Sequence, residues 1–218
     1  MAAITLPTLI QNYQKRVTVE KLKTSYSLLT QTFERAKIDY GTDLKQWDSG
    51  GRDGTARYVV YNNYFKPYLD VTNLSKSVCP KGKCNPSYKA LSGGNVNLSG
   101  LEGSFYLKNG AFIWIRPFVC GVADYSNVIY IDINGPKHGP NILGKDTFDF
   151  VFRVGAKPNI ERQKTPLISA CEGYSRDQLK NICNKSYKDK RCGAENVVSC
   201  CAELIKKDGW QISKDYPW

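Results

Sequence analysis

The longest hydrophobic pattern in the chain begins at Val19 and has the spacing of an amphipathic helix. Apolar side chains recur in alternating steps of three and four residues, which places them on one face of a helix. They are Val19, Leu22, Tyr26, Leu29, Phe33, Ala36 and Tyr40. Gly41 follows, and glycine is common just beyond a helix C-terminus. The pattern predicts a long helix ending near residue 40, and periodicity alone is typical of an ordinary helix packed on a sheet.

Further along the chain, the pattern predicts a short helix and then strands. Residues 57–69 carry apolar side chains at helical spacing. Four later segments have strand character: 104–107, 111–117, 128–133 and 147–154. Asn109-Gly110 separates the first two and favours a hairpin turn. The fold expected is α+β, with the long N-terminal α-helix packed on an antiparallel β-sheet of about four strands.

The C-terminal third predicts two short helices and an aromatic tail. Ser175 and Gln178 have the spacing of a capping box that opens a helix over 177–183, and a second helix is expected over 194–207, ending at Gly209. The tail contains Trp210, Ile212, Tyr216 and Trp218. We expect it to dock on the body; the alternative is a contact with other subunits or a ligand.

Eight cysteines and a single histidine favour disulfides over a metal site. The cysteines are Cys79, Cys84, Cys120, Cys171, Cys183, Cys192, Cys200 and Cys201. Their spacings match no zinc ligand set, whereas an even number suits an exported, disulfide-bonded protein. The sequence does not give the pairing, and free thiols in a cytosolic chain remain the alternative. Five of the eight lie beyond residue 156, so we expect three parts: the helix at 1–40, a globular core at 41–155, and a cysteine-rich subregion of the same domain at 156–218.

The charge balance is strongly basic, with 31 Lys and Arg against 20 Asp and Glu and a net charge of +11. The basic residues are spread along the chain without a nucleic-acid recognition motif. A basic surface facing an anionic cell-wall polymer or lipid is therefore favoured over specific binding of nucleic acid.

Between the last two predicted strands lies a loop rich in Asp and Asn. Asp132, Asn134, Asn141 and Asp146 could supply some of the six to eight oxygens that Ca²⁺ prefers. The loop begins like an EF-hand, but Leu143 stands where that motif needs a glutamate. Possible calcium binding competes with a simpler interpretation, in which the loop satisfies its own backbone. No other cofactor is predicted.

Catalysis is disfavoured. His138 is the single histidine and lies in a Gly- and Pro-rich loop. The chain has no nucleotide-binding loop, H-E-x-x-H zinc helix or G-x-S-x-G elbow. Two carboxylates could still converge in space, as in glycosidases. The interpretation from sequence is a protein that is not an enzyme.

The segment Ala2-Ala3-Ile4-Thr5-Leu6-Pro7-Thr8-Leu9-Ile10-Gln11-Asn12-Tyr13 resembles the part of type IV pilins and type II secretion pseudopilins where the apolar helix leaves the membrane. Pro7 matches that family's helix-bending proline. The resemblance implies that a membrane-embedded apolar helix, with a prepilin-peptidase site, precedes Ala2 in the complete protein. It covers about the first 40 residues well and the remainder more loosely, and it implies a pilin-like helix on a sheet.

The function implied is that of a structural subunit of an extracellular type IV pilus-like filament. Before assembly it would be anchored in the inner membrane, and in the filament it would contact further copies and other pilins. The residues expected to pack against neighbouring helices are Ile4, Leu6, Pro7, Leu9, Ile10 and Tyr13. The alternative is a minor pilin or pseudopilin that binds DNA or an anionic glycan, or a part of a type II secretion system.

Overall fold

A computed structural model describes most of the chain. The described residues are 5–50, 56–72, 88–96, 104–120, 124–155, 166–169, 171–185, 187–188 and 197–218. Three of the predicted disulfide cysteines, Cys79, Cys84 and Cys192, lie outside these residues, as does Ile4. Cys120 lies in a described strand, but its side chain is outside the described part.

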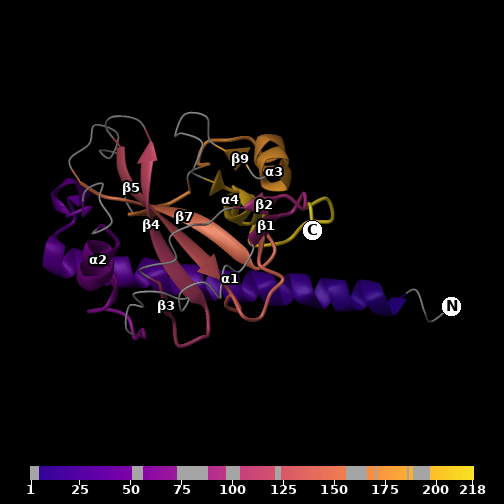
Figure 1. The fold of residues 1–218 in the computed structure, drawn as a ribbon, viewed down its shortest axis with the longest axis horizontal. Helices are drawn as coiled ribbons and strands as arrows, with labels where there is room; N and C mark the ends of the chain where they lie inside the picture. Colours follow the sequence, from indigo (N-terminus) through magenta and orange to yellow (C-terminus); the bar gives the residue numbers. More distant parts are fainter. Residues whose placement is uncertain are drawn as a thin grey trace.

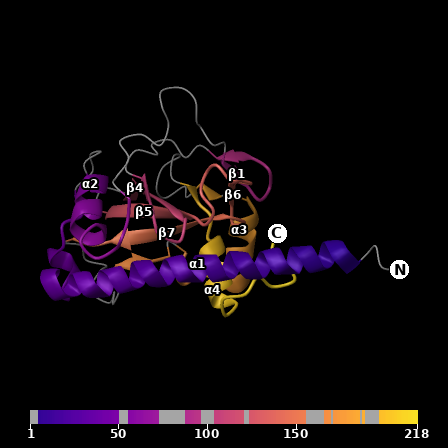
Figure 2. The ribbon, with the colours of Figure 1, turned by 90° about the horizontal axis from the view of Figure 1, so that it is seen from below.

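The long helix α1 spans Thr5–Tyr40, so at 1.5 Å per residue it is about 54 Å long. Its C-terminal half packs on the body, where Leu22, Leu29, Phe33 and Ala36 have no exposed surface. Its N-terminal part projects beyond the body (Figures 1 and 2). Gly41, at φ +79°, ends the helix and donates its N–H to the Lys37 carbonyl at 3.0 Å, which confirms the predicted end.

Among the described residues, the sheet has seven strands along one path, and an eighth strand pairs with β7 off this path. In spatial order the seven are β2 (Asn95–Val96), β1 (Tyr88–Ala90), β6 (Ile142–Leu143), β7 (Thr147–Arg153), β5 (Asp124–Asp132), β4 (Phe112–Cys120) and β3 (Ser104–Tyr106). The eighth is β8 (Leu167–Ile168). The central ladders are long: β4 pairs with β5 from Phe112↔Asp132 to Cys120↔Asp124, and β5 pairs with β7 over seven residues.

The predicted α+β class is confirmed, but the prediction of a four-stranded antiparallel sheet is wrong. The four predicted strands form the antiparallel run β3-β4-β5-β7. The sheet is larger, and it is mixed because β6 runs parallel to both β1 and β7. The additional strands have two or three residues each, which is too short for an alternating pattern to show in the sequence.

Aromatic packing joins α1 to the sheet. Phe33 lies 4.9 Å from Phe152 of β7 and 5.3 Å from Phe65, and Tyr26 lies 5.0 Å from Phe150 (ring centroids). Side chains alternate across a strand, so Phe150 and Phe152 face the helix whereas Asp149 lies on the opposite face. Nearly all of β7 is buried, which shows that both faces of the sheet are covered at this strand.

The remaining helices are short. The predicted helix at 57–69 exists as α2 (Ala56–Val60), which continues into the π-helix η3 (Tyr61–Phe65); a 3-10 turn, η2 (Leu44–Gln46), precedes both. Near the C-terminus lie α3 (Arg176–Lys185) and α4 (Cys201–Lys207). Between them in the sequence are β9 (Tyr187–Lys188) and β10 (Val197–Val198), which pair as a two-stranded sheet.

One predicted helix is therefore too long at its start. The expected helix over 194–207 begins at Cys201, and Val197 belongs to β10. Cys200 has a left-handed backbone, at φ +54°, which interrupts any helix entering from the N-terminal side. The predicted stop at Gly209 is confirmed: its φ is +73°, and its N–H bonds to the Lys206 carbonyl at 3.0 Å.

We predict that Gly144→Ala destabilises the fold by more than about 2 kcal/mol. Gly144 has φ +89°, and a Cβ there would collide with Cys201 Sγ and lie 2.9 Å from Leu91 Cδ1. Urea unfolding measures the difference. Gly94→Ala is the control, because a Cβ at Gly94 meets nothing within 4 Å. Equal stabilities for the two variants would contradict this close packing.

Candidate functional site

The N-terminal part of α1 exposes the apolar side chains predicted to contact other subunits. The exposed fractions are 62% for Leu6, 66% for Leu9, 50% for Ile10 and 68% for Tyr13. Pro7 is also exposed and lies in the first turn of the described helix. The spacing of Leu6, Leu9, Ile10 and Tyr13 places them on one face. We call residues 5–14 of α1 the helix tip.

The apolar stripe of the tip and the buried stripe of α1 lie on opposite faces of the helix. At about 100° of rotation per residue, the side chains of the tip point roughly opposite to Leu22, Leu29 and Phe33. The tip stripe is therefore no continuation of the core stripe, and the body of the same chain cannot cover it while α1 stays straight. Ile38, which is 83% exposed, lies on the outward face at the other end of α1.

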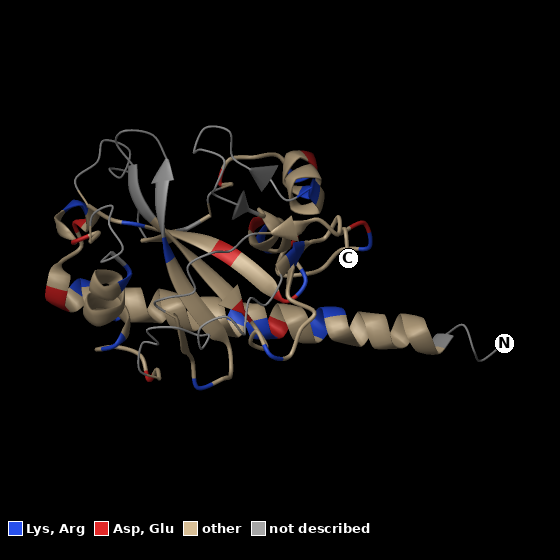
Figure 3. Cartoon of the chain, in the orientation of Figure 1, with Lys and Arg blue, Asp and Glu red and all other residues tan. Residues whose placement is uncertain are grey.

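The tip carries no charge, whereas the chain is basic where α1 meets the body. Residues 2–14 contain no Asp, Glu, Lys or Arg, and the next nine contain Lys15, Arg16, Lys21 and Lys23 against Glu20. This is four positive charges minus one negative, or +3. In Figure 3 the tip is tan, the colour of residues without charge, and blue residues follow along α1. None of the described helices has the length and apolarity to cross a membrane.

Two hollows flank α1 at this junction. One, of about 370 Å³, lies between α1, the loop after β5 and Trp218; Tyr13, Thr18, Lys21 and Lys145 are among its lining residues. The other, of about 440 Å³, lies between α1 and the tail, with Arg16 and Trp210 in its wall. We call the first the junction pocket.

The Asx-rich loop uses its carboxylates to hold its own backbone. Asp132 Oδ1 accepts the N–H groups of Asn134 (3.2 Å) and Gly135 (2.8 Å), and its Oδ2 accepts the Tyr88 hydroxyl at 3.0 Å. Asp146 accepts the N–H groups of Asn141 (2.8 Å) and Ile142 (2.6 Å). Burial, followed by the Asp146 charge, raises the pKa of Asp132 to about 6. Burial also raises the pKa of Asp146.

The structure thus brings together Asp132, Asn134, Asn141 and Asp146 in one loop. The carboxylate oxygens already accept hydrogen bonds, but the Oδ1 atoms of Asn134 and Asn141 are buried without a partner. Within the described residues no three His, Cys, Asp or Glu side chains cluster as metal ligands would. Calcium binding here stays a prediction. His138 lies in the same loop, where its backbone N–H donates to the Gly135 carbonyl at 3.0 Å.

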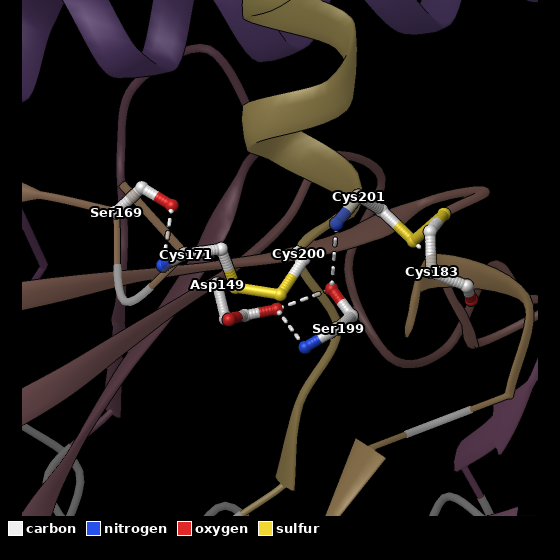
Figure 4. Close-up of a disulfide and its surroundings, with 7 residues drawn as sticks. All are labelled: Asp149, Ser169, Cys171, Cys183, Ser199, Cys200 and Cys201. Carbon is white, nitrogen blue, oxygen red and sulfur yellow. Dashed lines mark hydrogen bonds between the residues drawn. A yellow bond between two sulfur atoms is a disulfide. The ribbon is translucent and has the colours of Figure 1, made fainter. Parts of the chain in front are cut away.

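Two disulfides confirm that the C-terminal region is cross-linked. Cys171 bonds to Cys200 and Cys183 bonds to Cys201, with Cα–Cα distances of 5.6 and 4.8 Å. Because Cys200 and Cys201 are adjacent, the start of α4 is attached to two separate segments, one of them α3 (Figure 4). Both bridges are buried.

A buried carboxylate holds the residue that precedes these cysteines. Asp149 of β7 is 5% exposed and accepts both the backbone N–H of Ser199, at 3.0 Å, and the Ser199 hydroxyl. Figure 4 shows it beside the Cys171–Cys200 bridge. Burial raises the pKa of Asp149 to about 6, although the hydrogen bonds from Ser199 oppose this.

The aromatic tail docks on the body, as predicted, through both apolar and charged contacts. Arg176 of α3 makes a two-point contact with Asp208, at 2.6 and 2.9 Å, and another with Asp215, at 3.0 and 2.8 Å. These contacts hold the pKa values of both carboxyls below their usual range. Tyr216 is buried and donates to the Gly144 carbonyl at 2.6 Å. Trp210 lies 5.4 Å from Tyr26 of α1.

The capping box is also confirmed. The Ser175 N–H donates to Gln178 Oε1 at 2.9 Å, and the Gln178 N–H donates to Ser175 Oγ at 3.3 Å. Other functional contacts were not predicted from the sequence. The role of Asp149 could have been predicted, because it is a lone acid in an apolar strand. The partners of Arg176 lie 32 and 39 residues away, and no feature of the sequence indicates them.

Comparison with known proteins places the chain in a family without an assigned role. Residues 8–218 match the model of a family of unknown function, DUF6613. The chain belongs to this family. No curated protein and no solved structure matches it significantly.

We predict that Asp149→Asn reduces the gain in stability that the protein shows on mild acidification. A carboxyl whose folded pKa is raised binds more protons in the folded state, so stability falls as pH rises through about 4 to 6. Between about pH 7.5 and 5, Asp149 should account for a gain of about 1 kcal/mol. Asn resembles the protonated acid and removes this contribution.

Urea unfolding of both proteins at each pH provides the measurement. Glu172→Gln, at an exposed position, is the control and should keep the full pH dependence. An Asp149→Asn variant with the pH dependence of the parent would show that Asp149 is ionised throughout this range.

Proposed function

We propose that this protein is a structural subunit of an extracellular type IV pilus-like filament and assembles through its N-terminal helix. The observation that carries the proposal is the helix tip, which is uncharged and exposes Leu6, Leu9, Ile10 and Tyr13 beyond the body. The sequence resemblance to pilins and pseudopilins falls on the same residues.

Elementary energetics explain why such a tip needs a partner. Burying one large apolar side chain contributes about 1.5–3 kcal/mol, and the tip leaves four of them half or more exposed. The body cannot cover them, because they face away from the buried stripe. Helices of neighbouring copies could cover them in a filament core, which leaves the sheet and the cross-linked tail on the outside.

The disulfides support a location outside the cytoplasm. Buried, paired cysteines persist in oxidising compartments, and two such pairs lie in the described part of the chain. We therefore place the subunit in the inner membrane before assembly and at the cell surface afterwards, in a structural rather than an enzymatic role.

A minor pilin or pseudopilin that captures DNA or an anionic glycan is the second candidate, favoured by the net charge of +11. Binding dominated by phosphate contacts weakens steeply as salt rises. If the chain is a DNA-binding pilin, its affinity for duplex DNA should fall at least tenfold between low and physiological salt. Undetectable binding at low salt would reject DNA capture and leave the structural role untouched.

We predict that Leu9→Asp abolishes incorporation into filaments without destabilising the folded chain. Leu9 is 66% exposed, so the substitution should change the free energy of unfolding by less than about 0.5 kcal/mol. A charge buried among packed helices costs far more. The amount of subunit in filaments sheared from cells that express the complete gene should fall at least tenfold relative to total subunit.

Ile38→Asp is the matched control. It places the same charge at an exposed apolar position on the outward side of the same helix, but at the opposite end. It should assemble normally. Normal assembly of Leu9→Asp, or equal losses in both variants, would contradict assembly through the tip.

A further inference from the structure

We propose that the junction pocket binds the headgroup of an anionic phospholipid, so that it holds the subunit at the membrane surface by a specific contact. The inference rests on one part of the proposed function, namely that the helix tip enters a bilayer before assembly. It adds a binding site, a ligand class and the residues that recognise it.

The pocket has the position that such a ligand requires. Three parts of the chain form its wall: α1 with Tyr13, Thr18 and Lys21, the segment between β5 and β7 with Lys145, and Trp218 at the end of the tail. Its volume of about 370 Å³ lies within the range of small-molecule sites, about 300–1,000 Å³. Tyr13 belongs to both the pocket and the apolar tip, so the two surfaces are continuous.

The uncharged tip also ends at the pocket. Residues 2–14 contain no Asp, Glu, Lys or Arg, and Lys15 and Arg16 follow directly. When the tip enters a bilayer, Tyr13 and Trp218 therefore lie near the headgroups, where amphipathic aromatic side chains are enriched.

The charges around the pocket favour an anion. Lys21 and Lys145 line it, and no ion pair between described residues includes either of them. The ammonium groups of Lys15 and Lys145 lie 5.8 and 5.1 Å from the centre of the Trp218 ring, so two lysines contact one aromatic side chain in the pocket wall. A phosphate at this point would face several cations at once.

One acidic residue, Asp146, also lines the pocket, but its carboxylate is engaged elsewhere. Its oxygens accept hydrogen bonds from the N–H groups of Asn141 and Ile142 and from the Thr147 hydroxyl. These donors point the carboxylate into the loop, and they compensate part of its charge.

Binding of the chain to vesicles tests the proposal. Vesicles of phosphatidylcholine alone are compared with vesicles that also contain phosphatidylglycerol, by co-sedimentation at constant ionic strength. We expect clearly tighter binding to the second. Lys21→Gln and Lys145→Gln should each weaken it about fivefold. Lys66→Gln is the matched control: Lys66 is exposed and directly follows η3, which continues from α2 at the far end of the body (Figure 1), and its loss should have little effect.

Three outcomes would overturn the pocket: equal binding to both vesicle types, equal losses for Lys66→Gln and Lys145→Gln, or displacement from vesicles by inorganic phosphate at concentrations that leave ionic strength unchanged. The first removes the charge preference, the second indicates diffuse attraction, and the third indicates a site for free phosphate.

Leu9→Asp separates this inference from the proposed function. If it leaves vesicle binding unchanged, the tip does not enter lipid and that part of the proposed function fails, whereas the lysine variants still decide the pocket and incorporation into filaments still decides assembly.

Discussion

The arrangement depends on the packing of the second half of α1 against β7. Phe33 and Tyr26 contact Phe152 and Phe150, and the buried stripe around them has no exposed surface at Leu22, Leu29 or Phe33. A helix held this firmly over several turns cannot pivot at its free end without breaking that packing. The direction and distance at which the tip projects are therefore fixed by the core. Any contact made by the tip is therefore made at a defined position relative to the body.

The C-terminal region then determines which side chains lie beside α1. The adjacent cysteines 200 and 201 attach α4 to two other segments, and Asp149 holds Ser199 in front of them. Arg176 binds Asp208, at the end of α4, and Asp215, within the tail. Tyr216 reaches Gly144, the glycine that leaves room for Cys201. These contacts place Trp210 and Trp218 along α1. Trp218 lines the junction pocket, and Trp210 lines the other hollow.

Local patterns predicted those parts of the fold that depend on local spacing. The stripe from Val19 to Ala36, the stop at Gly41 and the capping box of Ser175 and Gln178 all involve residues a few positions apart, and the structure confirms each. The strands β1 and β6 pair with each other from distant parts of the chain, and β2 has only two residues, so no local pattern marked them. For the same reason the disulfide pairing and the Arg176 contacts were beyond prediction. Of the candidate site, the exposed tip was predicted, whereas the junction pocket combines three distant segments and was not.

In the proposed function, the tip and the pocket together impose a condition on assembly. The same apolar stripe cannot contact lipid and the helices of other copies at once, so a subunit of such a filament would have to leave the bilayer in order to assemble. Each pocket contact with a headgroup opposes that transfer. A few lysines near a charged surface contribute about 1 kcal/mol each, while each tip side chain that moves from lipid to a protein core keeps most of its hydrophobic gain. The headgroup contact is thus strong enough to orient the subunit at the membrane and weak enough to be replaced by helix packing. A basic junction with only a few lysines, rather than a dense cationic cluster, meets both requirements.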